Sequence, residues 1–323
     1  MPLSAATLGP TVTVGEILVE IMATTIGPGF LTTQPLIGPY PSGAPAIFID
    51  QCGRMGCPSA MIGAVGSDDF GRVNLDRLQR DGVDISAVAI DPAFPTGSAF
   101  VRYRDDGTRD FVFNIATSAA ARFGWTDRVQ HLIASAGHLH VMGSALTMPS
   151  ACEVIDQAVG IVKARGGSLS VDPNLRKELQ LAPQIEARFS RLVAQADLLL
   201  PSGDELERAA GIDGEAAAVA RLLGLGVEEI VLKRGAQGAT CFGRDGSRVD
   251  AAPFRVSEID PTGAGDCFGG AYVASRRLGL PVEQALTYAC AAGARNVTFR
   301  GPMEGAGTRA ALDGFIASTP RGF

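Results

Sequence analysis

DPTGAGDCFGG, residues 260–270, places two glycines and an alanine directly before an aspartate, Asp266. Glycine lets the backbone approach a ligand closely. Backbone N–H groups that face outward where a loop enters a helix form a positive hollow that binds anions. A carboxylate beside this hollow repels a resident anion, unless the carboxylate takes part in a reaction of that anion. The stretch therefore predicts a site where an anionic group reacts.

A transferring phosphoryl group suits this site, because its transition state needs positioning and charge stabilisation more than covalent help from the protein. The N–H groups of Gly263, Ala264 and Gly265 would face the phosphoryl group, with the positive end of the helix dipole behind them. Asp266 would act as the general base that accepts the proton of a nucleophilic hydroxyl.

Two other interpretations of the stretch stay open at this level. Glycine and aspartate are ordinary residues at a helix start, so GAGD alone is compatible with a structural turn. A dinucleotide fingerprint is the second, since Glu283 follows at about the required spacing of twenty residues. That fingerprint belongs in a βαβ unit, whereas Glu283 falls in the second of two consecutive helical segments. No Gly-x-x-x-x-Gly-Lys-Ser/Thr motif is present, so a P-loop is excluded.

The length, composition and net charge are those of a globular protein. It has 323 residues, of which 46% are hydrophobic and 19% charged, with a net charge of −6. This composition excludes a disordered or collagen-like chain, and an acidic protein poor in lysine does not favour nucleic acid. The six cysteines form no Cys-x-x-Cys pair, no basic region precedes the apolar N-terminal part, and no apolar run reaches the ~18 residues that cross a bilayer. We expect a soluble, cytoplasmic protein without nucleic-acid or membrane partners.

Most of the chain alternates apolar strand patterns with amphipathic helix patterns, as βαβ units do. A first strand is expected over residues 11–22, interrupted by Glu16 and Glu20, and Asp68 is placed to cap a helix. Later strands are HLHVMG, GSLSVD, ADLLLP and EEIVLKRG, and helices are expected near residues 44–55, 150–165, 186–195, 203–210, 214–224, 265–278 and 282–297. The pattern predicts a mostly parallel sheet, whose ligands bind at the carboxyl ends of the strands.

Residues 86–115 show a different pattern, with short runs of period two. FVRYR and RDFVFN flank the turn sequence DDGT, which indicates an antiparallel hairpin. Antiparallel strands within a βαβ chain predict a small sheet that stands off the main one and closes over a ligand as a lid.

DPTGAGDCFGGAYV resembles the C-terminal signature of the pfkB, or ribokinase-like, carbohydrate kinases. Five further motifs resemble the family in its order along the chain: VGEILVE, AVGSDDFGRVNLDRLQRDGVD, VDPNLR, PSGDELE and VLKRGAQGA. The resemblance covers nearly the whole chain. It implies a ribokinase-like three-layer α/β/α sandwich with a mostly parallel sheet, formed as a single domain by residues 1–323. It also implies a small protruding β-sheet lid, formed from about residues 23–42 and 86–115.

The resemblance implies ATP as the phosphoryl donor, Asp266 as the catalytic base, and the amides of residues 263–266 as the anion hole. Lys233, Gly235 and Gly238 belong to a motif of the nucleotide side, where Lys233 would reach a phosphate. Taken alone, a lysine at a strand end is equally compatible with an exposed cap.

Metal binding is implied at two places. Glu205 would order Mg²⁺ through water, which suits a metal ion that keeps most of its waters. Ser202 stands where the family usually has Asn. Asp260 and Thr262 imply a site for a monovalent cation, K⁺. Without the resemblance, Glu205 is compatible with a solvated helix face.

The sugar side departs from the family pattern. Glu20 stands where many members have an Asp that binds sugar hydroxyls, and Ile47 where they have an Asn. PSGAPAIFI resembles the substrate-binding turn, which gives Gly43 and Ala44 a contact role. Further substrate contacts are expected from the lid and from the end of a core strand, at Arg102, Arg104, Asn114, Asn174 and Arg176. Lid charges are also compatible with a solvated face, and Arg176 with a structural ion pair.

The resemblance implies ATP-dependent phosphorylation of a sugar hydroxyl. FVFN in the lid, where keto-acid kinases usually have a Tyr-x-Arg pair, favours a ketohexose such as tagatose or fructose. A kinase of 2-keto-3-deoxysugar acids, of the 2-dehydro-3-deoxygluconate type, is the alternative. A catalytically silent sugar-sensing module and a dehydrogenase are alternatives of other classes. By analogy with the family, two lids would pair in a homodimer.

His138 and His140 alternate on one expected strand, so both side chains would face the same side. A third ligand is missing nearby in the sequence, which argues against a metal site at these histidines.

Overall fold

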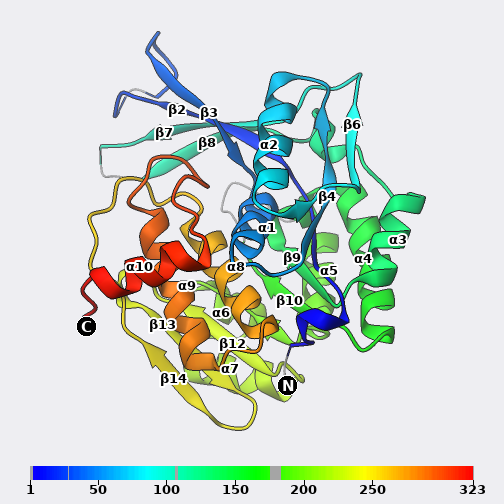
Figure 1. The fold of residues 1–323 in the computed structure, drawn as a ribbon, viewed down its shortest axis with the longest axis vertical. Helices are drawn as coiled ribbons and strands as arrows, with labels where there is room; N and C mark the ends of the chain where they lie inside the picture. Colours follow the sequence, from blue (N-terminus) through cyan, green and yellow to red (C-terminus); the bar gives the residue numbers. More distant parts are fainter. Residues whose placement is uncertain (1–2, 28, 106–107, 175–182, 323) are drawn as a thin grey trace.

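The computed structural model describes residues 3–27, 29–105, 108–174 and 183–322. Within them, a ten-stranded sheet has the order β14-β13-β12-β11-β10-β9-β1-β4-β5, with β6 paired to β4 (Figure 1). Its pairs are parallel except β12–β13 and β13–β14. The strands are β1 (Thr11–Val14), β4 (Ser59–Gly66), β5 (Val83–Asp84), β6 (Val88–Asp91), β9 (His138–Met142), β10 (Ser168–Asp172), β11 (Leu198–Leu199), β12 (Glu229–Lys233), β13 (Ala239–Gly243) and β14 (Arg248–Ala251).

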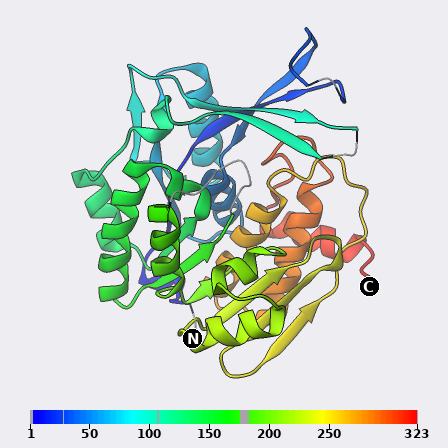
Figure 2. The same ribbon diagram turned by 180° about the vertical axis from the view of Figure 1, so that it is seen from behind.

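Helices cover both faces of this sheet, which confirms the three-layer α/β/α sandwich (Figures 1 and 2). One face carries α1 (Ala44–Arg54), α2 (Asp69–Arg80), α8 (Ala264–Arg277), α9 (Val282–Asn296) and α10 (Arg309–Ser318). The other face carries α3 (Asp127–Ser135), α4 (Pro149–Ala164), α5 (Pro183–Val193), α6 (Glu205–Ala210) and α7 (Glu215–Gly224). Each face has its own cluster of buried apolar side chains.

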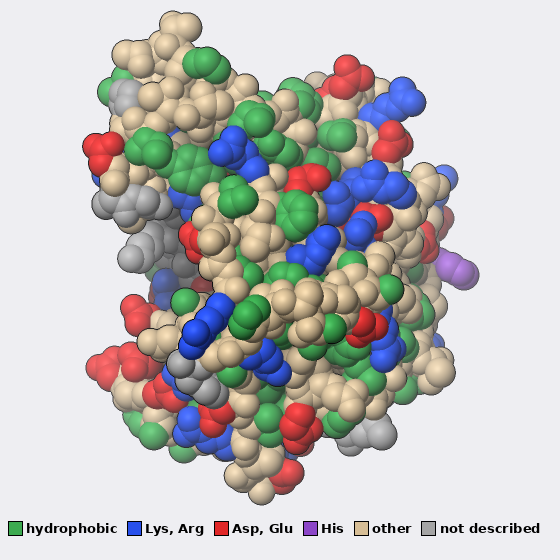
Figure 3. All heavy atoms as spheres, turned by 60° about the vertical axis from the view of Figure 1, so that its left-hand side comes forward, with side chains coloured by type: hydrophobic (Ala, Val, Ile, Leu, Met, Phe, Trp, Pro, Cys, Tyr) green, Lys and Arg blue, Asp and Glu red, His purple; other side chains and the backbone are tan. Residues whose placement is uncertain are grey.

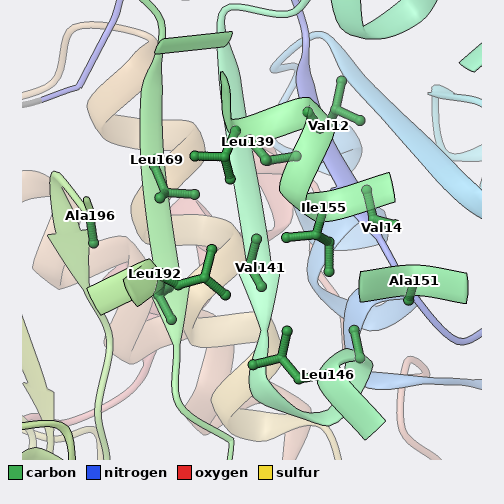
Figure 4. Close-up of a cluster of buried hydrophobic side chains, with 14 of the residues drawn as sticks. Val12, Val14, Leu139, Val141, Leu146, Ala151, Ile155, Leu169, Leu192 and Ala196 are labelled. Carbon is green, nitrogen blue, oxygen red and sulfur yellow. The ribbon is translucent and has the colours of Figure 1, made fainter. Parts of the chain in front are cut away.

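The cluster beneath α4 shows why the central strands are apolar. Successive side chains of a strand point to opposite faces, so Val12 and Val14 of β1 reach the same layer. Figure 4 shows these strand side chains beside helix side chains. The strands contribute Val12, Val14, Leu139, Val141 and Leu169, and they pack with Leu146 before α4, Ala151 and Ile155 of α4, Leu192 of α5 and Ala196 after α5. A sheet covered on both faces needs apolar residues on both sides of its strands, which accounts for the unbroken apolar runs.

The single strand predicted over residues 11–22 is wrong. β1 ends at Val14, and β2 (Leu18–Ala23) belongs to a second sheet. At the break, Gly15 packs against the start of α1, where a Cβ atom would lie 2.6 Å from Pro45 Cγ. Glu16 and Glu20 interrupt the apolar run because they line a pocket between the two sheets. An apolar run carries no signal about which sheet each half joins, so the sequence alone merged two strands.

The second sheet forms the lid, with the order β3-β2-β7-β8. It contains β3 (Leu36–Ser42), β7 (Gly97–Tyr103) and β8 (Arg109–Asn114), and it stands above the main body in both views (Figures 1 and 2). β7 and β8 form the predicted antiparallel hairpin. The sheet differs from the predicted limits in two places: β2 is included, and residues 88–91 form β6, which pairs with β4. Lid strands and edge strands share the period-two pattern, so periodicity could not separate them.

The helices predicted after residue 40 are present within one turn of their expected ends. Asp68 caps α2, since its Oδ1 accepts a hydrogen bond from the N–H of Gly71 at 2.8 Å. The β13–β14 hairpin and α10 are additions that the sequence did not predict. Among the helices of the described residues, none combines the length and apolar character needed to span a membrane.

Candidate active site

The quoted motif forms the start of α8. Gly263, directly before the helix, has a left-handed backbone with φ of 78°. A Cβ atom here would lie 2.2 Å from the carbonyl oxygen of Pro302, so only glycine fits without moving that backbone. The first N–H groups of a helix lack acceptors within the helix. The motif therefore presents backbone donors at the N-terminus of α8, as an anion hole requires.

Asp266 lies in the first turn of α8 and is 7% exposed. Asn174 Nδ2, just past the end of β10, donates to Asp266 Oδ1 at 3.3 Å. Asn174 has a φ of 35°, which is uncommon for a residue other than glycine, and its N–H donates to Asp172 Oδ1 at 3.2 Å. The carboxyl end of the central strand β10 is thus tied to the carboxylate of Asp266 through one amide side chain.

Lys233, the last residue of β12, points toward the same helix start. Its Nζ lies 2.5 Å from Asp172 Oδ2 and 3.7 Å from the position that a Cβ of Gly265 would occupy. Burial raises the pKa of Asp172 to about 7, against the lowering effect of Lys233. For Lys233, burial lowers the pKa, but the charges of Asp172, Glu205 and Asp266 outweigh it and the net shift is upward. Lys233 is therefore held as a cation beside the anion hole.

The two predicted nucleotide-side glycines shape the turn that follows Lys233. Gly235 has a φ of 54° and opens a short 3-10 turn that leads into β13. Gly238 has a φ of 89°, and a Cβ atom there would lie 2.0 Å from the carbonyl oxygen of Ala251. Both positions therefore favour glycine because of their backbone conformation. The turn beside Lys233 consequently carries no side chain at either position.

Glu205 begins α6, and its Oε2 accepts a hydrogen bond from the N–H of Ser202 at 2.8 Å. The backbone of Ser202 therefore orients this carboxylate, so the main-chain contact persists although Ser replaces the expected Asn. The charge of Glu205 also raises the pKa of Asp172, which shows that the two carboxylates lie near each other. Carboxylate oxygens suit Mg²⁺. Across the described part of the chain, no three His, Cys, Asp or Glu side chains converge as direct ligands.

A pocket lies between the main body and the lid. Its lining combines lid strands with the start of α1 and the segment after β9. Ser42 Oγ donates to Glu20 Oε2 at 3.0 Å and fixes that buried carboxylate. The described lining residues are Glu16, Leu18, Glu20, Ser42, Gly43, Ala44, Ala99, Phe111, Phe113, Ile115, Ser144, Thr147 and Met148.

The chemistry of this lining is acidic and aromatic. Glu16 and Glu20 contribute carboxylates, and no Lys, Arg or His occurs among the described lining residues. Phe111 and Phe113 of β8 are stacked, with ring centroids 5.3 Å apart and planes 6° apart. Carboxylates accept hydrogen bonds from hydroxyl groups, and aromatic faces pack against C–H surfaces. The described lining therefore offers acceptors for hydroxyl groups and apolar faces for C–H surfaces.

Some residues predicted to contact substrate line the pocket and others do not. Glu20, Gly43 and Ala44 lie in its lining. Gly43 needs a left-handed backbone, with φ of 109°, because a Cβ there would lie 2.4 Å from the carbonyl oxygen of Glu16. Ile47 is buried in the core beneath α1.

The predicted lid contacts lie elsewhere. Arg102 and Arg104 both pair with Asp110, at 2.6 and 2.8 Å, and neither lines the pocket. Asn114 donates from Nδ2 to Ser98 Oγ at 3.4 Å and is exposed. Side chains on a strand alternate between faces, so Phe111 and Phe113 face the pocket where the neighbouring polar residues cannot.

Arg176 lies outside the described residues. Asn174 is placed against Asp266 rather than in the lining of the sugar pocket.

The predicted monovalent-cation residues form a closed network. Asp260 Oδ1 accepts from the N–H and the hydroxyl of Thr262, at 3.0 and 2.7 Å, and Oδ2 accepts from the N–H of Gly301 at 3.0 Å. Arg109 Nη1, from β8 of the lid, donates to Thr262 Oγ1 and lies 3.9 Å from Asp260 Oδ1. Asn296 Nδ2 donates to the carbonyl of Thr262 at 2.8 Å. A cation against Asp260 Oδ1 would lie beside a guanidinium, so these contacts do not fit the predicted K⁺ site.

The buried histidines have structural partners. His138 places its ring nitrogens against Ser168 Oγ and Ser170 Oγ, at 2.8 and 2.7 Å. His140 Nδ1 lies 2.7 Å from Ser170 Oγ, and its ring stacks on Phe48 with centroids 3.6 Å apart. Burial lowers the pKa of both histidines well below the usual value. They belong to the core of the main sheet.

Sequence reasoning missed several residues of the site. Asp172 is the second residue of the motif VDPNLR and the last residue of the buried strand β10, and a polar residue at that place is a signal that could have selected it. Arg109 and the two phenylalanines carry no comparable signal, because an alternating hairpin does not reveal which of its faces covers a ligand.

A helix N-terminus bordered by a carboxylate and a lysine, near a pocket with acceptors for hydroxyl groups, is compatible with a phosphotransferase that uses an alcohol acceptor. The chain belongs to the pfkB family of carbohydrate kinases, whose family model, described as pfkB family carbohydrate kinase, matches residues 11–309. It is accordingly a sugar phosphotransferase, which removes the dehydrogenase alternative.

Named relatives agree with this assignment. The chain is 33% identical over 296 residues to the 2-dehydro-3-deoxygluconokinase of Thermoproteus tenax, covering 91% of this chain and 90% of that protein. A putative ribokinase II from E. coli, in complex with ATP and Mg²⁺, has a TM-score of 0.89 and 43% identity, covering 96% and 99% of the two chains. A fructokinase double mutant of Vibrio cholerae, bound to fructose, ADP and potassium ion, has a TM-score of 0.80 and 27% identity, covering 95% and 98%.

Proposed function

We propose that this kinase transfers the γ-phosphoryl group of ATP to a hydroxyl of a neutral sugar, a ketohexose such as fructose or tagatose. The observation that carries the proposal is the lining of the pocket, in which Glu16 and Glu20 are accompanied by no basic side chain among the described residues. Like charges placed together cost several kcal/mol, so two glutamates disfavour the carboxylate of a sugar acid. The fructokinase that resembles this chain binds fructose.

The described geometry supports a direct mechanism. The sugar hydroxyl that is phosphorylated would face Asp266, and Asn174 holds that carboxylate in place to accept the hydroxyl proton. The N–H groups at the start of α8 and the ammonium of Lys233 stabilise the charge of the transferring phosphoryl group. Mg²⁺, when bound, would neutralise charge on the donor phosphates, with Glu205 holding its waters.

The lid completes this mechanism. Phe111 and Phe113 of β8 line the pocket together with Gly43 and Ala44, so the lid and the main body both contribute to it. A sugar bound between these groups would lose its contact with bulk water, which protects the phosphoryl group from hydrolysis and strengthens the electrostatic contacts at Asp266 and Lys233.

A kinase of 2-keto-3-deoxysugar acids is the second candidate, favoured by the name of the Thermoproteus tenax relative. It requires a basic side chain near the substrate carboxylate, and Arg176 is the predicted residue that would supply one. A catalytically silent sugar-sensing module is the third candidate. Asp266, Lys233 and Gly263 are all in place, which supports the two enzymes over this module.

The test is ADP release with Mg·ATP across a panel of ketohexoses, aldohexoses, pentoses and 2-keto-3-deoxysugar acids. We expect one neutral ketohexose to have the highest kcat/KM. A higher kcat/KM for a sugar acid would replace the proposal with the second candidate. Sugar binding by calorimetry without any ADP release would favour the sensing module.

We also propose that two copies pair through their lids. Several apolar side chains of the lid are exposed: Ile26 (62%), Leu31 (90%), Leu36 (46%) and Val112 (54%). Figure 3 shows hydrophobic side chains at the surface of the upper part of the molecule, where the lid lies. Apolar surface of this kind is typical of contact sites between proteins. Light scattering should give the mass of a dimer, and a monomeric mass would remove this proposal.

We also propose that the protein is cytoplasmic. All six cysteines are free and buried, and free thiols are typical of a reducing compartment. Fractionation of cells that express the native protein would test this location, and recovery with extracellular proteins would contradict it.

A further inference from the structure

Asp260 is a buried carboxylate, 1% exposed, at the entrance to the loop that leads into α8. Its oxygens accept hydrogen bonds from two backbone N–H groups and one hydroxyl, of Thr262 and Gly301. These neutral donors orient the carboxylate but do not neutralise it. A buried charge without an opposite charge nearby is strongly destabilising. The loop therefore needs a cation close to Asp260.

The lid supplies that cation. Arg109 Nη1 lies 3.9 Å from Asp260 Oδ1 and donates to Thr262 Oγ1, and that hydroxyl in turn donates to Asp260 Oδ1. The chain of contacts runs from guanidinium to hydroxyl to carboxylate. Among the described residues, no other Lys, Arg or His makes an ion pair with Asp260.

Other parts of the lid approach the same place. Burial raises the pKa of Tyr103 on β7, and the negative charge of Asp260 raises it further. A Cβ atom on Gly301 would lie 2.7 Å from the ring of Tyr40 on β3. In both ribbon views the ends of β7 and β8 lie beside the segment that leads into α8 (Figures 1 and 2). The lid therefore rests on the loop that sets the anion hole.

We propose that Arg109 supplies from the lid the positive charge that a monovalent cation would otherwise bring to Asp260 and Thr262. Nucleotide binding and turnover are then independent of potassium. Thr262 immediately precedes Gly263, whose left-handed backbone starts α8, so a side chain that fixes Thr262 also fixes the N–H groups of the anion hole. Arg109 is a positioning residue, since it acts on the phosphoryl site through Thr262 and Asp260.

The test compares Arg109→Gln with Arg104→Gln. Arg104 lies in the same hairpin but pairs with Asp110 and touches neither Asp260 nor Thr262 in any described contact, so it controls for the loss of one lid charge. ATP affinity by calorimetry and the melting temperature are measured for each protein in potassium chloride and in N-methylglucamine chloride at equal ionic strength. These two readouts require no sugar.

The wild type and Arg104→Gln should bind ATP equally, within about twofold, in the two salts. Arg109→Gln should lose about tenfold in ATP affinity in N-methylglucamine chloride, the usual effect of removing a charge-assisted hydrogen bond. Potassium should restore part of the loss. The buried Oδ1 of Asn296, which accepts no hydrogen bond from the described residues, is an oxygen that such an ion would use. Arg109→Lys, which keeps the charge, should remain near the wild type in both salts.

Two results would overturn the inference. One is a wild type that binds ATP at least about tenfold more tightly in potassium chloride, which needs no variant to fold. The other is an Arg109→Gln protein that matches Arg104→Gln in both salts. A measurement of sugar turnover in the two salts would rest on the proposed function, whereas ATP affinity and melting temperature do not. If no sugar is phosphorylated but ATP binding shows the expected salt effects, the proposed function fails and the role of Arg109 stands.

Discussion

The phosphoryl end and the sugar end of the site are built in different ways. Gly263 and Asp266 come from one continuous motif at a helix start, and Lys233 ends a strand of the main sheet. The sugar end instead collects Glu20 and Phe113 from lid strands and further residues from the loop after β9. Every kinase of this kind handles the same phosphoryl group, whereas the acceptor varies. A short motif can therefore specify the first end, but the second depends on how two sheets are placed together.

The comparison predicts that the largest loss of turnover comes from the phosphoryl end. Asp266→Asn should lower kcat by ~10²–10⁴, the usual contribution of a general base. The KM for the sugar should change little, because asparagine keeps the shape of the side chain and an oxygen that accepts a hydrogen bond. Steady-state kinetics of ADP release checks both values. A kcat within threefold of the wild type would remove Asp266 as the base.

Gly263→Ala tests the backbone of the same end. The added methyl group would collide with the carbonyl oxygen of Pro302, at 2.2 Å, and displace the N–H groups of α8. We expect kcat to fall by about 10², the usual cost of losing an oxyanion-hole donor.

Gly279→Ala is the matched control for Gly263→Ala. Gly279 follows the same helix with a φ of 87°, and a Cβ there would meet nothing within 4 Å. It should cost about 1 kcal/mol of unfolding free energy from backbone strain alone and leave kcat unchanged. Equal kinetic effects of the two substitutions would mean that the contact with Pro302 is irrelevant to catalysis.

The sugar end should respond in KM rather than in kcat. Glu20→Gln removes the charge that accepts the hydrogen bond of Ser42 and that faces the sugar. We expect the sugar KM to rise about tenfold, with kcat within a few-fold of the wild type. Asn114→Ala, on the same lid but outside the pocket lining, should change neither value. The assignment of the pocket is contradicted if Asn114→Ala raises KM and Glu20→Gln does not.

The smallest effect is expected from His138, in the core of the main sheet beneath both ends of the site. Burial lowers the pKa of His138 well below its usual value, so the folded protein keeps this ring neutral. Between that lowered pKa and about 6.5, the unfolded chain binds a proton that the folded chain does not. Unfolding free energy should therefore decrease as the pH falls below about 6.5.

His138→Gln should reduce this pH dependence by roughly 1 kcal/mol per pH unit, with kcat unchanged at pH 7. Urea unfolding at pH 7, 6 and 5 measures it. His131→Gln, at an exposed position, is the control and should keep the slope of the wild type. A slope that His138→Gln does not alter would show that another group controls acid stability.

The sequence predicted much of the main sheet and the phosphoryl end. Buried parallel strands and amphipathic helices have distinct periods, and the positive φ of Gly263 and Gly238 is a local requirement that only glycine meets. Asp68 was likewise predicted to cap a helix, and it accepts a hydrogen bond from the N–H of Gly71 at the start of α2. In each case the residue that can be recognised in the sequence is also the residue whose own backbone conformation or hydrogen bond forms the local structure.

The sugar end was less predictable, because its contacts join residues far apart in the chain. Nothing near Arg109 reveals that it meets Thr262, since the two residues come together only when the lid sheet rests on the loop before α8. Arg102 and Asn114 were expected at the sugar but lie against Asp110 and Ser98. The break of the first strand at Gly15 was hidden for the same reason, because it depends on contact with Pro45 of α1.

Direct competition between two substrates tests most directly whether the acidic pocket selects a neutral sugar. The preferred ketohexose and 2-dehydro-3-deoxygluconate are mixed at equal concentration with limiting Mg·ATP, and both phosphorylated products are quantified by mass spectrometry. The product ratio equals the ratio of the two kcat/KM values. We expect at least about tenfold more sugar phosphate than phosphorylated acid, since one uncompensated charge contact costs more than about 1.4 kcal/mol. An excess of the phosphorylated acid would contradict this expectation.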